Sequence, residues 1–222
     1  GFIPTHKKPI FCLDLGANVD CKAAYLYQFA LMGHAYMKSI GACDNPRVVL
    51  LSNGHEPYKG TAEVKKAYDL LFASRLNFQG NLEAREIFNG DADVLVTDGF
   101  VGNVMLKSIQ GMARALLGWL GNEVNQLSWV RRLLFWVNKD IFQRIKNKTD
   151  YASVGGALLL GVNHPIIIAH GSSDARAMHN AIRYAYRVVQ EKQLDRFKEM
   201  LAPLCAAQPV SSYAETINYQ EM

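Results

Sequence analysis

Short apolar runs alternate along this chain with longer segments in which apolar residues recur at spacings of three and four. Continuous apolar runs are typical of strands buried on both faces, and helices connect such strands in parallel sheets. Strands are predicted over residues 10–15, 47–52, 76–80, 93–98 and 165–169. Helices are predicted over residues 21–40, 61–72, 101–120, 172–191 and 192–204. The alternation therefore predicts an α/β fold, with a mostly parallel sheet covered by helices on both faces.

Local signals refine this picture. Thr61 is expected to cap the helix over 61–72, and Ser172 or Ser173 the helix over 172–191. The apolar run PIIIA at 165–169 is expected to be a buried strand. A length of 222 residues suffices for one large domain or two small domains with a real core. We expect one α/β core over 1–206, with an amphipathic helical insertion at about 122–149, followed by a tail over 207–222.

Composition narrows the function classes. The formal charge of +4 is far from the strong excess of a dedicated nucleic-acid binder, so no nucleic-acid partner is expected. The four cysteines form no CxxC pair and no zinc-type spacing, which favours a reduced, cytoplasmic compartment and predicts no metal site. Cys12 is expected to be a small core residue. No apolar run approaches the roughly 18 residues that a membrane-spanning helix needs.

The segments that follow four predicted strands contain the same types of residue. They read LDLGANVD (13–20), LLSNGHEPYKG (50–60), VTDGFVGNVMLK (96–107) and IIIAHGSSDA (166–175). Each combines glycine, a polar side chain and the start of a helix, which together suit a phosphate or another small anion. Ligands of parallel α/β sheets bind at the carboxyl ends of the strands. The alternative is ordinary turn and cap chemistry, which uses the same residue types.

Four polar residues at these strand ends carry the chemical hypotheses. Asp14 lies inside a predicted apolar strand and, as a buried carboxylate, needs hydrogen-bond partners, which a neighbouring turn could supply. Lys59 could contact a phosphate or remain solvated. Asn103 could donate to an oxyanion or act as a cap. His170 could be an acid–base group, a phosphate ligand or a hydrogen-bonded core histidine.

A basic amphipathic stretch occupies residues 128–147. Its apolar stripe is widened by aromatic residues. It contains several basic residues and a single acidic residue, Asp140. This pattern is typical of a helix on an anionic membrane surface. A dimer interface and an ordinary half-buried helix remain alternatives. The residues expected to contact the membrane are Trp129, Leu133, Leu134, Trp136 and Val137.

Several motifs together resemble one known family. They are LDLGANVDC (13–21), QFALMGHAY (28–36), NPRVVLLSNG (45–54), KG (59–60), DGFVGNVMLK (98–107), YASVGGALLLGV (151–162) and AHGSSDARA (169–177). In order and spacing they resemble the PlsX family of bacterial phosphate acyltransferases, to about residue 190. The resemblance implies a fold similar to that of phosphotransacetylases and isopropylmalate dehydrogenases.

The resemblance also implies an activity. Family members transfer a fatty acyl group from acyl carrier protein to inorganic phosphate, and the acyl phosphate enters phospholipid synthesis. They use no cofactor, form homodimers and associate with the inner face of the cell membrane. By this resemblance Lys59 and Asn103 are the expected catalytic residues, with Lys59 on the phosphate charge and Asn103 on the carbonyl or the phosphate. The expected substrate and phosphate site comprises Asp14, Gly16, Asn18, Gly54, Asp98, Gly99, Gly102, His170, Gly171 and Ser172.

The chain departs from the family pattern in two places. The match begins part-way into the pattern, so we expect the chain to start within a longer protein. His55 and Pro57 stand where the family usually has acidic residues, which affects the loop that carries Lys59. The alternative functions are a phosphotransacetylase-like transfer from acyl-coenzyme A, a non-catalytic module that binds carrier protein or membrane, and a dehydrogenase of the same fold.

Overall fold

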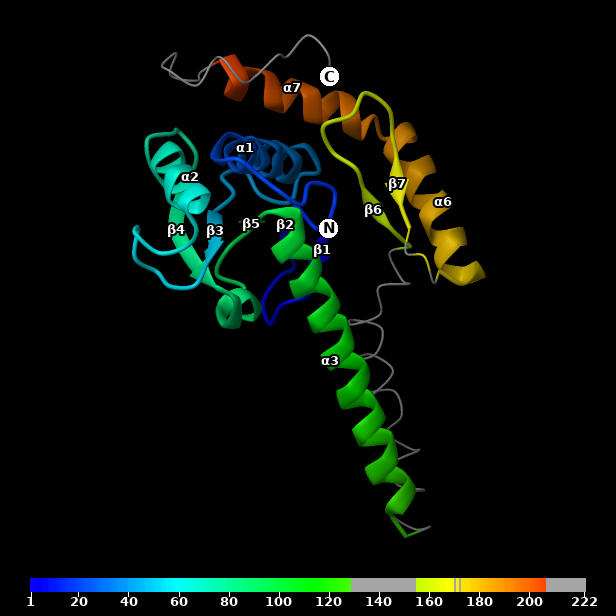
Figure 1. The fold of residues 1–222 in the computed structure, drawn as a ribbon. Helices are drawn as coiled ribbons and strands as arrows, with labels where there is room; N and C mark the ends of the chain where they lie inside the picture. The colour runs from blue at the N-terminus through cyan, green and yellow to red at the C-terminus, as the bar shows by residue number, and fades with distance from the viewer. Residues whose placement is uncertain (129–154, 170, 172, 207–222) are drawn as a thin grey trace.

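A five-stranded sheet forms the centre of the molecule (Figure 1). The structure, a computed structural model, describes residues 1–128, 155–169, 171 and 173–206. The strand order is β1-β2-β5-β3-β4, formed by β1 (Phe2–Ile3), β2 (Ile10–Leu13), β3 (Val48–Ser52), β4 (Phe78–Glu83) and β5 (Val94–Val96). Strands β2 to β5 pair in parallel, and the short β1 pairs antiparallel with β2. The predicted α/β class with a mostly parallel sheet is confirmed.

The central strands are apolar because both of their faces are covered. Residues of β2 and β5 are buried throughout, and Val48, Val94 and Val96 are fully inaccessible to solvent. Cys12 of β2 is fully buried in the core, as predicted. Burial raises the pKa of its thiol to about 12. A parallel strand covered on both faces loses the alternation that would mark a half-exposed strand.

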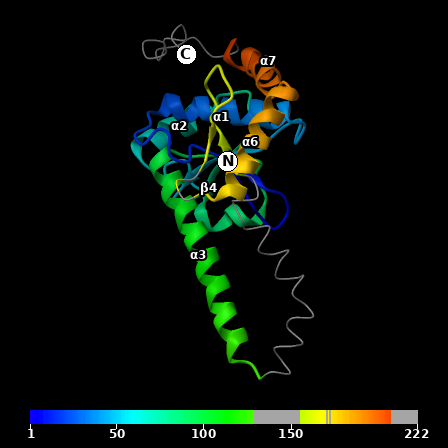
Figure 2. The ribbon, with the colours of Figure 1, turned by 90° about the vertical axis from the view of Figure 1, so that its right-hand side faces the viewer.

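Three helices form the layer on one face of the sheet. α1 (Ala23–Ser39) and α2 (Ala62–Phe72) lie next to the strands, and α7 (Gln193–Ala206) packs outside α1 (Figures 1 and 2). Leu26, Ala30 and Tyr36 of α1 are buried in the core cluster of this face. The predicted Thr61 cap is confirmed, because its hydroxyl accepts a hydrogen bond from the Val64 amide.

The opposite face has a smaller core. It is covered by the 3₁₀ helix η1 (Ala84–Asn89) and by the first turns of α3 (Gly99–Gln126), whose Met105 and Ile109 pack there. Beyond these turns α3 projects far past the sheet (Figure 2). The helix predicted over 101–120 is therefore longer at both ends.

The apolar run at 165–169 differs from its prediction. Only Ile167–Ile168 form a strand, β7, which pairs antiparallel with β6 (Ala157–Leu158) in a separate two-stranded sheet. The side chains are half-exposed, and Ile168 is 53% accessible. The prediction of a buried strand was wrong because an apolar run specifies a strand without specifying which sheet it joins.

The last two helices lie beside this hairpin. α6 (Ala175–Gln190) begins at Asp174, whose carboxylate accepts a hydrogen bond from the Ala177 amide at 2.7 Å. The cap is therefore Asp174 and not Ser172 or Ser173, because a carboxylate is an equally good acceptor one residue nearer the helix. The insertion at about 122–149 falls largely, and the tail over 207–222 entirely, outside the described residues, so the domain boundaries stay a prediction.

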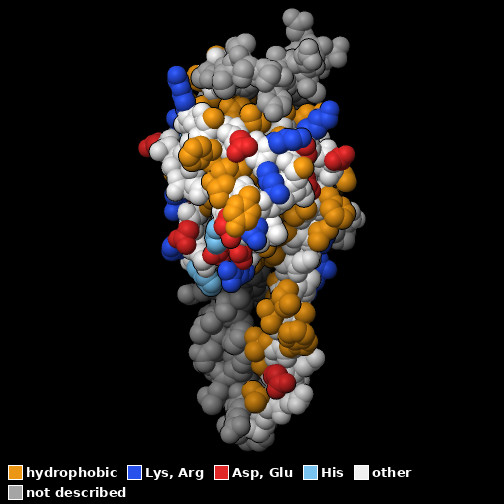
Figure 3. Space-filling view, turned by 60° about the vertical axis from the view of Figure 1, so that its left-hand side comes forward, with side chains coloured by type: hydrophobic (Ala, Val, Ile, Leu, Met, Phe, Trp, Pro, Cys, Tyr) orange, Lys and Arg blue, Asp and Glu red, His pale blue; other side chains and the backbone are white. Residues whose placement is uncertain are grey.

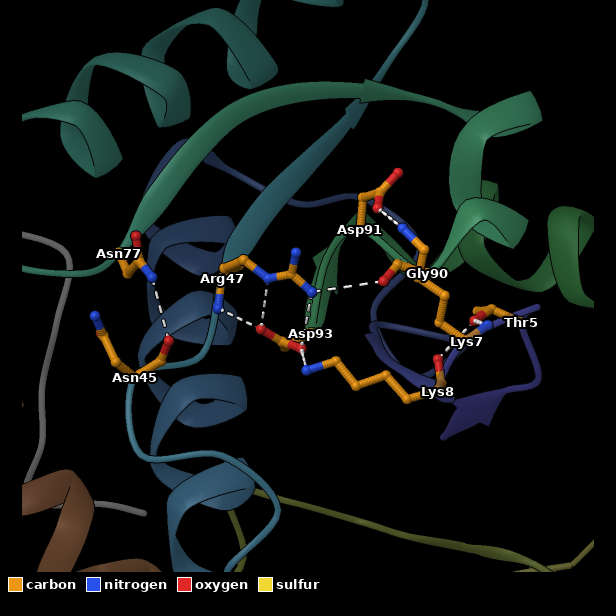
Figure 4. Close-up of polar contacts among 9 residues, drawn as sticks. All are labelled: Thr5, Lys7, Lys8, Asn45, Arg47, Asn77, Gly90, Asp91 and Asp93. Atoms are coloured by element: carbon orange, nitrogen blue, oxygen red, sulfur yellow. Dashed lines mark hydrogen bonds and ion pairs between the residues drawn. The ribbon is translucent and has the colours of Figure 1, made fainter.

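An ion cluster around the buried Asp93 carboxylate joins the segments that precede β2, β3 and β5, at the amino ends of the parallel strands (Figure 4). Asp93, 1% accessible, lies just before β5, and its carboxylate accepts from the backbone amide and guanidinium of Arg47, at 2.9 and 3.0 Å. Lys8 pairs with the same carboxylate. Burial of Asp93 opposes its ionisation, but these hydrogen bonds outweigh burial and lower its pKa to about 2. The cluster is structural, because it lies at the end of the strands opposite to the glycine-rich turns.

Candidate functional site

Three of the four glycine-rich strand ends meet at one edge of the sheet. β2, β5 and β3 are adjacent and parallel, with Leu13, Val96 and Leu50 in register across them. The segments that follow them must therefore emerge side by side. This edge is the candidate site.

The turn after β2 is organised by Asp14. Its buried carboxylate accepts hydrogen bonds from the amides of Gly16, Ala17 and Asn18 at 2.7–2.9 Å. The side-chain amide of Asn18 donates to the same carboxylate at 2.9 Å. Asp14 thus fixes the turn, as the sequence suggested. These backbone amides are therefore not open to an external anion, because the Asp14 carboxylate already occupies them.

The start of α3 packs directly onto this turn. The Gly99 amide donates to the Asn18 carbonyl at 2.8 Å, and Asp98 caps the helix by accepting from the Val101 amide at 2.7 Å. A Cβ on Gly102 would lie only 1.9 Å from the Asp14 carbonyl oxygen. Only glycine allows the two backbones to approach so closely. The ends of β2 and β5 therefore form one unit.

Asn103 projects at the junction of this unit. Its side chain lies beside Gly16, with its Cγ atom 3.6 Å from the position that a Cβ on Gly16 would occupy. Asn103 is exposed, and it is the fifth residue of α3, one turn in from the start of the helix. The arrangement offers an amide donor next to a preformed turn.

Lys59 lies in the loop after β3. Its alkyl chain packs over Gly54, since a Cβ there would approach its Cγ to 2.9 Å. Its ammonium group is 5.7 Å from the centroid of the Tyr58 ring. The loop closes through the Gly60 amide, which donates to the Asn53 side chain at 2.8 Å. No hydrogen bond or ion pair joins Lys59 to Asn103 within the described part of the chain; they lie at neighbouring strand ends.

Glu63 joins α2 to α1, its neighbour in the same helical layer, and the sequence reasoning missed it. α1 begins after Lys22, which gives it no side-chain cap; instead Glu63 of α2 accepts a hydrogen bond from the Ala23 amide at 2.7 Å. Hydrogen bonds from Lys66 and from the Ala23 amide lower the pKa of Glu63. Glu63 thus caps α1 from the neighbouring helix. A cap that comes from 40 residues away leaves no local spacing signal.

The fourth strand end does not join this edge in the structure. β7 belongs to the separate hairpin, Gly171 is exposed, and Asp174 serves as the α6 cap. His170 and Ser172 lie outside the described residues, so their roles stay predictions. The expectation of four such ends in one sheet is therefore corrected to three. No cluster of His, Cys, Asp and Glu able to hold a metal occurs among the residues that the structure describes.

Comparison with known families matches residues 1–196 to the family described as "Fatty acid synthesis protein". The chain belongs to this family. The match covers all three strand ends of the candidate site and both catalytic candidates, Lys59 and Asn103. The resemblance to PlsX proteins is confirmed.

Three relatives of this chain are each named phosphate acyltransferase. The chain is 45% identical over 199 residues to a phosphate acyltransferase of Thermodesulfovibrio yellowstonii, covering 90% of the chain and 57% of the relative. It is 48% identical over 189 residues to a phosphate acyltransferase of Moorella thermoacetica, covering 85% and 56%. One from Nitratidesulfovibrio vulgaris is 39% identical over 216 residues, covering 97% and 61%. The chain thus spans rather more than half the length of these relatives.

Proposed function

We propose that this family member is a phosphate acyltransferase that moves a fatty acyl group from acyl carrier protein to inorganic phosphate. The observation that supports it most is the placement of Lys59 and the Asn103–Gly16 junction at neighbouring strand ends. A cation and an amide donor at one edge suit a reaction between an anion and a carbonyl. The name shared by the relatives points to the same reaction class.

The proposed reaction needs few groups. A phosphate oxygen attacks the thioester carbonyl, the C–S bond breaks, and the carrier thiol leaves as acyl phosphate forms. Lys59 offsets the phosphate charge and holds the nucleophile near the carbonyl. Asn103 donates to the oxyanion that develops on the carbonyl oxygen, or to the phosphate. A thiolate is a good leaving group, so no covalent acyl-enzyme is required.

The test is thiol release from palmitoyl–acyl carrier protein, with and without inorganic phosphate, with acyl phosphate trapped as its hydroxamate. We expect phosphate-dependent release and a trapped product. Lys59→Ala should raise the KM for phosphate at least tenfold, since it removes a charge-assisted contact of about 1.5–3 kcal/mol. Lys65→Ala, an exposed lysine in α2, is the matched control and should leave the KM unchanged.

Several outcomes would contradict this function. Release that is independent of phosphate would exclude phosphate as the acceptor. Faster release from palmitoyl-coenzyme A than from the carrier protein would favour the phosphotransacetylase-like alternative. Binding of carrier protein without turnover would favour a non-catalytic module. An unchanged KM in Lys59→Ala would remove Lys59 from the phosphate site.

We also propose that the enzyme works as a homodimer on the inner surface of the cell membrane. Beyond Gly111, α3 exposes an apolar stripe with helical spacing, formed by Met112, Leu116, Trp119 and Leu120. Figure 3 shows apolar side chains gathered along this projecting part of the helix. A stripe of this kind suits a partner helix or a lipid surface. In the described part of the chain, no helix is both long and apolar enough to cross a bilayer.

The membrane proposal is tested by vesicle binding. Leu133→Asp and Leu134→Asp should reduce co-sedimentation with anionic vesicles about tenfold, because a charge on the apolar stripe opposes insertion. Circular dichroism should stay unchanged. Asp140→Asn is the control and should bind as well as the original chain or better. Undiminished vesicle binding by both Leu variants would refute the proposed contact.

A further inference from the structure

A β-bulge in β4 lies beneath the loop that carries Lys59. Val48 of β3 pairs with Phe78, whereas Leu50 pairs with Asn81. Two residues of β4, Gln79 and Gly80, therefore stand opposite the single Val49. Gly80 has a φ of +94°, a backbone conformation that glycine adopts without strain. Bulges of this kind change the direction in which the following side chains point.

The bulge decides which side chain faces the α1–α2 layer at this end of β4. Phe78 packs against the core cluster of that layer, and Leu82 packs against the cluster on the opposite face. With strict alternation Leu82 would share the face of Phe78. The extra residue instead gives Asn81 the face of its partner Leu50, and Asn81 is only 5% accessible. The chain thus buries a polar side chain where an apolar one would otherwise stand.

The side-chain amide of Asn81 donates a hydrogen bond to the loop that carries Lys59. Its Nδ2 atom donates to the Glu56 carbonyl at 2.8 Å, and the Lys59 amide donates to the same oxygen at 3.0 Å. One carbonyl therefore joins β4 to the turn that presents Lys59. A backbone oxygen has two lone pairs and accepts both bonds.

A second contact holds the same loop. The His55 ring lies between the Asn81 carbonyl, 3.3 Å from Nδ1, and the Glu86 carboxylate of η1, 3.0 Å from Nε2. His55 is exposed, so this pair contributes less than the buried amide of Asn81. Both contacts connect the loop to elements that lie outside the predicted site.

We propose that Asn81 is the positioning residue for Lys59. The bulge orients Asn81, Asn81 fixes the Glu56 carbonyl, and that carbonyl fixes the backbone of Lys59. The part of this inference that concerns phosphate rests on the proposed function. Asn81 touches no substrate in this scheme and acts only through the loop.

The test compares Asn81→Leu with Asn77→Leu. Leucine keeps the branching and the heavy-atom number of asparagine, with bulkier methyl groups, and removes the donor. It also removes a buried oxygen, Oδ1, that has no hydrogen-bond partner in the described part of the chain, which offsets part of the cost. Asn77 lies just before the same strand and also donates to a backbone carbonyl, that of Asn45, at 3.2 Å. This contact lies at the amino end of β4, away from the Lys59 loop (Figure 4). Asn81→Ser, which is too short to reach Glu56, is the second variant.

Hydrogen exchange of the Lys59 and Gly60 amides is the first readout. Loss of one hydrogen bond worth about 1 kcal/mol should speed exchange about fivefold in both Asn81 variants and leave it unchanged in Asn77→Leu. Binding of inorganic phosphate is the second readout, and its affinity should fall about fivefold in the Asn81 variants. Exchange at the original rate in both Asn81 variants would overturn the proposal.

The two readouts separate this proposal from the proposed function. Faster exchange with unchanged phosphate affinity would overturn the link between Asn81 and phosphate. If the original chain itself binds no phosphate, the proposed function fails, and exchange alone decides whether Asn81 positions Lys59.

Discussion

Gly102→Ala should lower the free energy of unfolding by about 3 kcal/mol or more. The added methyl would lie 1.9 Å from the Asp14 carbonyl oxygen and 3.0 Å from the Thr97 methyl. The near neighbour is backbone and cannot rotate away, so α3 must move off the turn. Urea unfolding measures the loss of stability, and amide chemical shifts of residues 14–18 should report the displacement.

Gly111→Ala is the matched control for this prediction. Gly111 lies in the same helix, and a Cβ there meets no atom within 4 Å. Alanine should therefore raise helix stability by about 1 kcal/mol through its higher propensity. If both variants changed stability in the same direction, the close contact between α3 and the Asp14 turn would be refuted. Gly102→Ala should also abolish the proposed acyl transfer, since Asn103 moves with the helix.

Asp93→Asn should have a comparable effect at the other end of the sheet. The substitution removes the carboxylate charge that Arg47 and Lys8 face, and these two side chains are 35% and 48% exposed. The pKa of Asp93, about 2 against an ordinary 3.8, corresponds to a loss of about 2 kcal/mol. Asp91→Asn is the control: Asp91 pairs with Lys7 in solvent, and its loss should change little. Equal midpoints of thermal unfolding for both variants would contradict the proposed importance of the buried cluster.

The same cluster predicts the acid stability of the chain. The pKa of Asp93 is about 2 in the folded protein, below its ordinary value of 3.8. The unfolded state therefore binds the proton more readily, and acid favours unfolding. The contribution, about 2 kcal/mol, is present above pH 4 and should be lost as the pH falls toward 2. Unfolding curves of the original chain and Asp93→Asn should converge over this interval.

The sequence predicted the sheet well because its evidence is local. β2, β3 and β5 are apolar runs bounded by turn residues, and their burial on both faces is what makes them apolar. The same evidence failed at PIIIA, since an equally apolar run formed a half-exposed hairpin. The partner with which a strand pairs depends on contacts between residues far apart in the chain. Such contacts produce no periodic pattern in the sequence.

The sequence predicted only those parts of the candidate site whose contacts are local. Asp14 and Asp98 accept hydrogen bonds from amides within four residues of their own position, so turn chemistry revealed them. Glu63 and Asn81 act across distances of 40 and 25 residues. A bulge that shifts the pleat of β4 also reverses the face assigned to every later residue of the strand. The pairing register puts Asn81 on the face of Leu50, and the hydrogen bond to Glu56 shows that it reaches the Lys59 loop.

The turn after β2 has a consequence for how the site attracts its ligand. Consecutive backbone amides that point to one spot form a nest, a concavity that commonly binds an external anion. Here the nest is filled by a carboxylate of the same chain, so its shape is set before any ligand arrives and needs no reorganisation. The attraction for an incoming anion must then come from groups around the nest, with Asn103 on one side and Lys59 at the neighbouring strand end. The turn serves as a rigid wall, and selectivity rests with the side chains that it aligns.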